Sequence, residues 1–192
     1  MTNPNDLRVI KTRKNIEDSF IRLLERRNFS MITVQDILDE ALINRKTFYR
    51  YYRDKYDLAE QIIRGFYGKL ERLFLERSDR DFTTPETATE TARRAYRMLY
   101  DDRRAILALW DVKTNEIDFY TMLQNLMQLK YKEIMENDDL PSTDIELESY
   151  LTSVIMLHTL KYMLESGREF TPEEMLQNFR EIYAFLTAGM EE

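Results

Sequence analysis

Glycine and proline, the residues that most often interrupt regular structure, each occur only four times in this chain of 192 residues. Loop-rich β folds need many turns, and turns depend heavily on these two residues, so an extensive sheet is not expected. Ten methionines and frequent leucine, glutamate, arginine and lysine favour helices instead. Apolar residues also recur at helical spacing, as in Ile16, Phe20, Leu23 and Leu24. The sequence therefore predicts an all-α fold, and its periodic segments give about nine helices.

Several classes of function are excluded or disfavoured by missing residues. Cysteine is absent, which excludes disulfide scaffolds, zinc fingers, thiol catalysis and iron–sulfur clusters. The one histidine, His158, disfavours a Ser-His-Asp triad and a His-rich metal site. No phosphate-binding glycine loop or metal-ligand spacing is present. We therefore expect no enzyme, no metal and no cofactor.

The chain also lacks the apolar segments that membranes require. No apolar run approaches the ~18 residues that span a bilayer. The opening residues, MTNPNDLRVIKTRKN, contain no apolar leader segment. We expect a cytoplasmic protein with no membrane partner.

Charge is unevenly distributed along the chain. Residues 1–56 hold 12 Lys and Arg against 8 Asp and Glu, whereas the remainder holds 16 against 27. Positive charge in the first segment suits an approach to phosphates, and negative charge in the second disfavours it. A chance fluctuation in surface charge is the alternative interpretation.

Two short helices near the amino end are expected at residues 33–41 and 44–51. Their short connection is typical of a helix-turn-helix, whose second helix enters the major groove of DNA. If Phe48 faces the core, Lys46 and Arg50 point the opposite way at 100° per residue. Arg45, Thr47 and Tyr49 add further donors. An ordinary helical hairpin with a solvated basic face is the alternative.

Two segments carry a resemblance to a known family: TVQDI at residues 33–37 and ALINRKTFYRYYRDKYDL at residues 41–58. They resemble the N-terminal domain of the TetR (tetracycline repressor-like) transcription factors, over about residues 12–75, a third of the chain. Leu42 departs from this pattern by replacing the family's turn glycine, so the turn needs a non-glycine conformation or a slightly different bend. Lys46 replaces a recognition-helix glycine, which adds charge at the groove.

The resemblance implies DNA-binding roles for a set of polar side chains. Base reading is expected from Arg45, Lys46 and Thr47. Phosphate contacts are expected from Thr33, Tyr49, Tyr51 and Lys55, and either kind of contact from Arg50. Contacts to phosphate or the minor groove are expected from Arg13 and Lys14. Asn44, which caps the recognition helix, is also expected to bind DNA. The domains are expected to be residues 1–56, which bind DNA, and residues 57–192, a helical regulatory and dimerisation domain.

The last two expected helices carry more apolar surface than one buried face needs. The resemblance implies a homodimer through a four-helix bundle, and a wholly buried helix in a monomer is the alternative. Predicted interface residues are Leu151, Val154, Ile155, Phe179, Ile182 and Leu186. The resemblance also implies an unknown small-molecule effector, with candidate lining residues Tyr96, Tyr100, Trp110, Tyr120, Met127, Tyr131, His158 and Tyr162. The alternative is that these eight are ordinary core side chains.

Local signals predict where the helices begin and end. N-caps or capping boxes are expected at Thr33, Asn44, Asp54, Thr84, Thr143 and Thr171. Gly167 is expected just past the end of the eighth helix, and residues 78–85 are expected to form a linker.

Together these features predict a sequence-specific transcriptional regulator, a ligand-responsive repressor that binds a pseudo-palindromic operator as a homodimer. The alternative is a co-regulator or activator that acts through a protein partner, motivated by the altered turn at Leu42.

Overall fold

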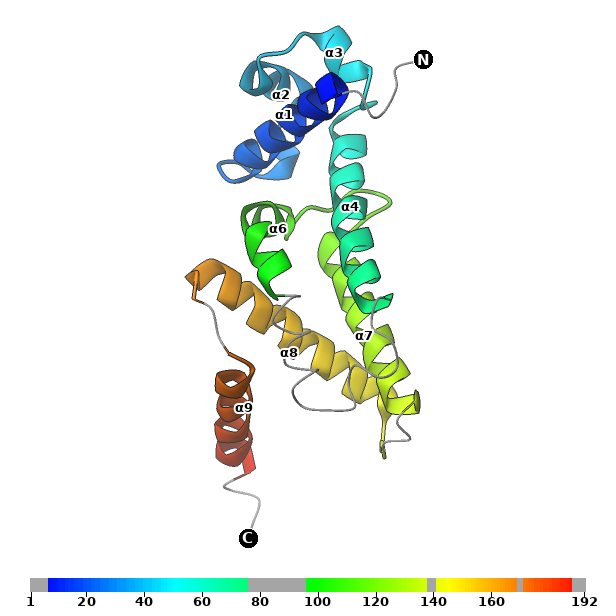
Figure 1. Ribbon diagram of the computed structural model, residues 1–192, viewed down its shortest axis with the longest axis vertical. Coiled ribbons are helices and arrows are strands. Elements are labelled where there is room, and N and C mark those ends of the chain that lie inside the picture. Colours follow the sequence, from blue (N-terminus) through cyan, green and yellow to red (C-terminus); the bar gives the residue numbers. More distant parts are fainter. Residues whose placement is uncertain (1–6, 76–95, 138–140, 169–170, 188–192) are drawn as a thin grey trace.

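The computed structural model describes residues 7–75, 96–137, 141–168 and 171–187, and within these ranges every regular element is a helix (Figure 1). The α-helices are α1 (Leu7–Leu24), α2 (Val34–Ala41), α3 (Arg45–Tyr49), α4 (Lys55–Leu75), α6 (Arg103–Leu109), α7 (Phe119–Asn137), α8 (Ile145–Ser166) and α9 (Pro172–Thr187). A 3-10 turn, η1 (Phe29–Met31), joins α1 to α2. The predicted all-α class is confirmed. The predicted linker and the cap at Thr84 lie outside the described residues.

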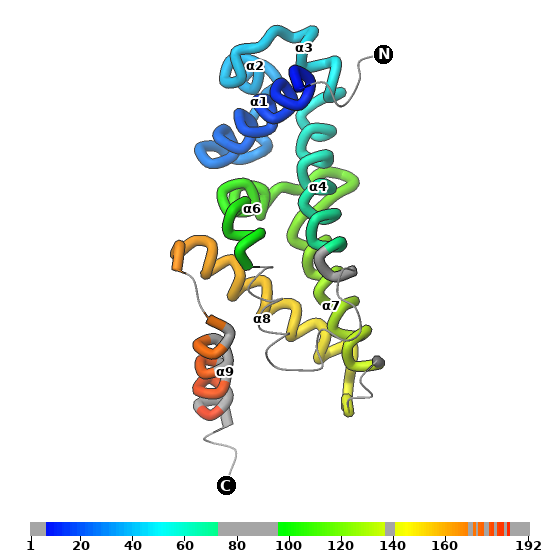
Figure 2. The backbone as a smooth tube through the Cα atoms, viewed as in Figure 1, coloured from blue at the N-terminus to red at the C-terminus, as the bar shows by residue number. Residues whose placement is uncertain are grey.

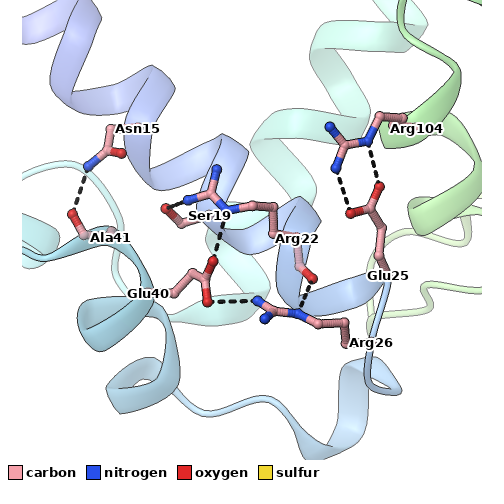
Figure 3. Close-up of polar contacts among 8 residues, drawn as sticks. All are labelled: Asn15, Ser19, Arg22, Glu25, Arg26, Glu40, Ala41 and Arg104. Atoms are coloured by element: carbon pink, nitrogen blue, oxygen red, sulfur yellow. Dashed lines mark hydrogen bonds and ion pairs between the residues drawn. The ribbon is translucent and has the colours of Figure 1, made fainter.

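Helices α1, α2 and α3 form a small head at one end of the molecule (Figure 1). Its core is apolar and fully enclosed, with Ile16, Phe20, Ile37 and Phe48 each at 0% exposure. Figure 3 shows the polar contacts that fasten α1 to α2 beside this core: Asn15 Nδ2 donates to the Ala41 carbonyl at 2.8 Å. Arg22 and Arg26 bind the two oxygens of the Glu40 carboxylate at 2.8 and 2.7 Å. A buried apolar core and the polar contacts beside it therefore stabilise the head.

Helix α4 runs from the head into the rest of the molecule (Figure 1). Asp54 caps it as predicted, because its Oδ1 accepts from the amides of Tyr56 and Asp57. The expected domain boundary at residues 56/57 falls in the first turn of this helix. One continuous helix therefore contributes to both parts.

The body is built from α4, α6, α7 and α8. Its buried residues include Ile106, Leu109, Phe119, Leu123 and Leu157. In Figures 1 and 2, α9 stands apart from these helices near the carboxyl end. None of the described helices is long and apolar enough to cross a membrane.

Most helix boundaries follow the predicted caps. Thr33 and Asp36 form the capping box of α2, and the Asn44 side chain accepts from the Thr47 amide. Gly167 ends α8 in the left-handed region at φ 65°. Thr171 and Glu174 exchange the two hydrogen bonds of a capping box at α9.

One predicted cap is wrong by a residue. The N-cap of α8 is Asp144, whose side chain accepts from the Leu147 amide, rather than Thr143. Glu148 accepts from the amides of Thr143 and Asp144, which closes the turn before the helix. Serine, threonine and aspartate in succession are all competent caps, so sequence alone does not choose among them.

Candidate nucleic-acid interface

The connection between α2 and α3 is a tight turn with a left-handed residue at its centre. Leu42 adopts φ 54° and ψ 44°, and it is the single non-glycine residue with positive φ among those the structure describes. The amide of Ile43 donates to the Leu38 carbonyl at 3.1 Å, which closes the end of α2. The expectation of a non-glycine conformation is therefore wrong, because Leu42 adopts the left-handed conformation that glycine favours. Leu42 is 91% exposed, so it makes almost no packing contact there.

Helix α3 is polarised across its axis. Phe48 is fully buried and packs against the rings of Tyr49 and Tyr52, at centroid distances of 5.5 and 5.7 Å. On the opposite side Lys46 and Arg50 are exposed, as the helical spacing predicts. Arg45 and Tyr49 are exposed as well, Thr47 and Tyr51 are half-buried, and Asn44 is used as the cap. The exposed face of α3 therefore carries the cations, and the buried Phe48 attaches the opposite face to the core.

The cations of the head fall into two groups, those bound to a carboxylate and those without an acidic partner among the described residues. Arg22, Arg26, Arg27 and Arg53 are each bound to a carboxylate. By contrast, no acidic partner within the described residues holds any of the exposed cations Lys11, Lys14, Arg45, Lys46 and Arg50. A cation already neutralised by a protein carboxylate has less to gain from a phosphate. The unpaired group is therefore the part of the head suited to a polyanion.

Arg13, a candidate for DNA contact, is engaged within the protein. It donates to Gln61 Oε1 at 3.1 Å and lies 4.0 Å from a Glu17 carboxylate oxygen. A hydrogen bond with Tyr52 raises the pKa of Arg13. Its neighbour Lys14 has no such partner among the described residues.

Lys55, a predicted phosphate contact, is bound to backbone carbonyls of the head. Its ammonium donates to the carbonyls of Phe29, Ser30 and Ile32 at 2.9, 3.1 and 2.7 Å. It also lies 4.8 Å from the centre of the Phe29 ring. An ammonium has three N–H donors, and all three are used. Removal from solvent by partial burial lowers the pKa of Lys55.

Thr33 is likewise committed to its helix. Its hydroxyl donates to Asp36 Oδ2 at 2.6 Å and accepts from the Asp36 amide at 3.1 Å. These bonds with Thr33 hold the pKa of Asp36 below its ordinary value. The hydroxyl proton predicted to reach a phosphate is therefore directed at a carboxylate.

Gln35 is a polar residue of this surface that sequence reasoning missed. It is exposed on the first turn of α2 and accepts a hydrogen bond from Arg45 Nη2 at 3.0 Å. The single signal in the sequence is Asp39, four residues later, whose carboxylate accepts from the Gln35 amide.

The candidate effector residues fall into separate groups. Trp110, Tyr120 and His158 form a row of rings with centroid distances of 5.9 and 6.0 Å. Tyr96 and Tyr100 donate to the carbonyls of Arg168 and Gly167. Tyr131 bonds Glu148, and Tyr162 is 62% exposed.

An enclosed apolar cavity of about 20 Å³ lies between α4, α6, α7 and α8. Of the eight candidate effector residues, Met127 alone lines it, and its other neighbours include Phe66, Leu99, Phe119 and Leu157. The structure therefore does not bring the eight residues into one site. Within the described residues, no three of His, Asp and Glu gather closely enough to hold a metal ion.

Helix α8 presents one buried and one exposed face. Leu157, Met163 and Leu164 are buried, together with Ser149 and Ser153. The exposed apolar residues are Leu147, Tyr150, Leu151, Ile155, Met156 and Tyr162. Of the other predicted interface residues, Val154 is half-buried and Ile182 on α9 is 54% exposed. The side chains of Phe179 and Leu186 lie outside the described part of the chain. We call these six exposed apolar residues of α8 the α8 stripe.

The fold and this surface define a class of protein. A three-helix head with a helix-turn-helix and an unpaired basic recognition helix, on a larger helical body, is the architecture of a DNA-binding regulator. Residues 18–62 match the family described as bacterial regulatory proteins, tetR family. This match spans the end of α1, helices α2 and α3, and the first part of α4.

The chain is also similar to a curated relative and to solved structures. An uncharacterised HTH-type transcriptional regulator of Bacillus subtilis (strain 168), YxbF, is 24% identical over 179 residues, which cover 91% of this chain and 45% of the relative. The chain therefore spans under half the length of that relative. A putative transcriptional regulator from Pseudomonas aeruginosa PAO1 is 19% identical, with TM-score 0.62, covering 92% of this chain and 90% of that one.

A TetR transcriptional regulator from Streptococcus agalactiae 2603V is 23% identical, with TM-score 0.60, covering 92% of this chain and 96% of that one. At these identities the two solved structures establish the fold.

Proposed function

We propose that this protein is a transcriptional regulator that binds a pseudo-palindromic DNA operator as a homodimer and represses transcription until a small molecule releases it. The observation that carries the proposal is the polarity of α3. Lys46 and Arg50 stand exposed and without an acidic partner in the described structure, opposite the fully buried Phe48. The family match to residues 18–62 covers this same surface.

The proposed contacts divide by chemistry. Arg45 and Lys46 carry the donors that guanine O6 and N7 accept, and Thr47 lies between them and the anchor Phe48. Tyr49, Arg50 and Tyr51 follow at the end of α3, where hydroxyls and a guanidinium suit phosphate oxygens. Lys14 on α1 adds a cation for the flanking backbone.

Dimerisation is supported by the α8 stripe. Large apolar side chains left exposed along one helix face indicate a surface that is covered in the working assembly. A two-fold dimer would place two recognition helices on one face of the duplex, and such half-sites are about 34–36 Å apart in helix-turn-helix dimers. Two weak half-site contacts then act together.

Control by a small molecule is supported by the place of the apolar cavity. Phe66 and Leu70 of α4 line it, and α4 is the helix that leads into the head. A cavity of about 20 Å³ holds no more than a water molecule, whereas ligand pockets usually measure about 300–1,000 Å³. An effector bound there must displace side chains of α4. We expect this displacement to shift α4 and so to change the position of the head.

Selection from a random DNA pool tests the proposal. The wild-type protein is expected to enrich a two-fold symmetric sequence, and its affinity should fall as salt rises. Lys46→Ala and Arg50→Ala should each weaken binding and reduce the salt slope by about one unit where a phosphate contact is lost. Arg64→Ala is the matched control, because Arg64 is an exposed cation on α4 bound to Glu116.

Absence of any enriched sequence, or equal effects of all three substitutions, would contradict DNA binding through α3. Candidate metabolites added to the bound operator then test release.

A further inference from the structure

We propose that Gln35 on α2 is a positioning residue that sets the base preference of Arg45 on α3. The inference rests on the proposed DNA-binding function and adds a specificity determinant from the other helix of the motif. Arg45 Nη2 donates to Gln35 Oε1 at 3.0 Å. The guanidinium of the first residue of α3 is thereby fixed to the first turn of α2.

The orientation of the Gln35 amide is determined by its other neighbour. Gln35 Nε2 donates to Asp39 Oδ1 at 2.8 Å, one turn further along α2. An ionised carboxylate only accepts hydrogen bonds, so the NH₂ group must face Asp39 and the carbonyl oxygen must face Arg45. The hydrogen bonds among these three residues therefore run one way: Arg45 donates to Gln35, and Gln35 donates to Asp39.

A neutral partner suits this task better than a charged one. Arg22, Arg26, Arg27 and Arg53 in the same head are bound to carboxylates, whereas Arg45 is held by an amide oxygen. A carboxylate would neutralise the guanidinium and repel the approaching phosphates. The amide restrains Arg45 without cancelling its charge.

The restraint leaves enough donors to read a base. A guanidinium has five N–H groups, and the contact with Gln35 uses one of them. Reading guanine O6 and N7 requires two, so a bidentate contact remains available. A long arginine side chain loses conformational entropy when it binds a base. An arginine that Gln35 already restrains loses less entropy in this step. Removing Gln35 should thus weaken discrimination at the base pair that Arg45 reads.

A double-mutant cycle tests the proposal. The base preference at every operator position is measured for wild type, Gln35→Ala, Arg45→Ala and the double variant. Arg45→Ala is expected to remove the preference at one base pair. Gln35→Ala should reduce the preference at that same base pair about 3- to 10-fold, the range that one hydrogen bond supplies. In the Arg45→Ala background, Gln35→Ala should have no further effect.

Two additional variants separate positioning from a local structural effect. Gln177→Ala is the matched control, because Gln177 on α9 also donates to an acid four residues later, Glu181, at 2.7 Å. It should leave the base preference unchanged. Gln35→Glu should weaken binding to all sequences, because it adds a negative charge beside Arg45. Thermal unfolding of Gln35→Ala should match that of wild type.

The outcomes distinguish this inference from the function on which it rests. If wild type enriches no sequence, both are overturned. If wild type selects an operator and Arg45→Ala relaxes it, but Gln35→Ala changes nothing, the inference alone is overturned. It is also overturned if Gln35→Ala acts additively at a different base pair, since Gln35 would then read a base itself.

Discussion

At the scale of single residues, Leu42 is held in a conformation that its side chain does not favour. Its φ of 54° brings the Cβ close to the following carbonyl, which costs an L-residue about 1–2 kcal/mol. No packing compensates, because the side chain is 91% exposed. The cost is tolerated because the turn between α2 and α3 is fixed by the helices on either side, whose inner residues Leu38 and Phe48 are buried.

Leu42→Gly is therefore expected to stabilise the protein. Glycine adopts positive φ without steric cost but loses more entropy on folding, which leaves a net gain of about 0.5–1 kcal/mol. Leu129→Gly is the matched control: Leu129 is also exposed, at 52%, but lies inside α7, where glycine should cost about 1 kcal/mol. Urea unfolding measures both. Destabilisation of similar size in the two variants would contradict the strain argument.

Lys55 gives a second residue-scale prediction. Lys55→Met keeps most of the aliphatic stem but leaves the carbonyls of Phe29, Ser30 and Ile32 without their ammonium partner. The expected loss of stability is about 1–3 kcal/mol, as for hydrogen bonds to charged groups. The salt slope of DNA binding should stay at its wild-type value, because no N–H donor of Lys55 is left for a phosphate. Unchanged stability with a reduced slope would restore the phosphate role.

At the scale of elements, helices and their caps follow from local sequence, whereas contacts between elements do not. The caps Thr33, Asn44 and Gly167 were predictable because each acts within three or four residues of its own helix end. Lys55 binds carbonyls 23–26 positions earlier, and carbonyls carry no residue-type signal. The Gln35–Arg45 bond depends on the angle between two helices, which the turn at Leu42 sets.

The capping box of α2 makes a prediction about pH. Hydrogen bonds from Thr33 and the nearby Arg27 lower the pKa of Asp36 from 3.8. A carboxylate whose folded pKa is depressed stabilises the protein above its unfolded pKa, and this stability is lost as the pH falls through the folded value. Asp36→Asn should therefore destabilise at pH 7, and the difference from wild type should shrink as the pH falls below 3.8.

Urea unfolding between neutral and acid pH measures this difference. Asp39→Asn is the control, because it removes an equal charge from the same helix outside the cap. A pH-independent difference for Asp36→Asn would show that the carboxylate charge does not matter to the cap.

At the scale of the whole molecule, the connections between head and body include one continuous helix and one ion pair. Helix α4 runs through both parts, and Arg104 of α6 binds Glu25, just past the end of α1, through two hydrogen bonds of 2.8 Å (Figure 3). Glu25 raises the pKa of Arg104. These two connections are the routes by which we expect a movement of α6 or α4 to reach the head.

The α8 stripe gives the last prediction, about assembly. Leu151 and Ile155 are each 48% exposed in the single chain and lie one turn apart on α8. Covering such side chains with a second copy removes apolar surface from water, and each fully buried side chain is worth about 1.5–3 kcal/mol. Replacing both with glutamate should place four unpaired charges in a two-fold interface and give a monomer. Leu129→Glu, a change of the same kind on α7, should leave the dimer intact.

Sedimentation velocity measures the mass of each variant. DNA titration should show that the monomeric variant binds a half-site as wild type does but loses the added affinity of the full operator. A wild-type protein that sediments as a monomer, or a double variant that remains dimeric, would place the interface elsewhere and remove the basis for a symmetric operator.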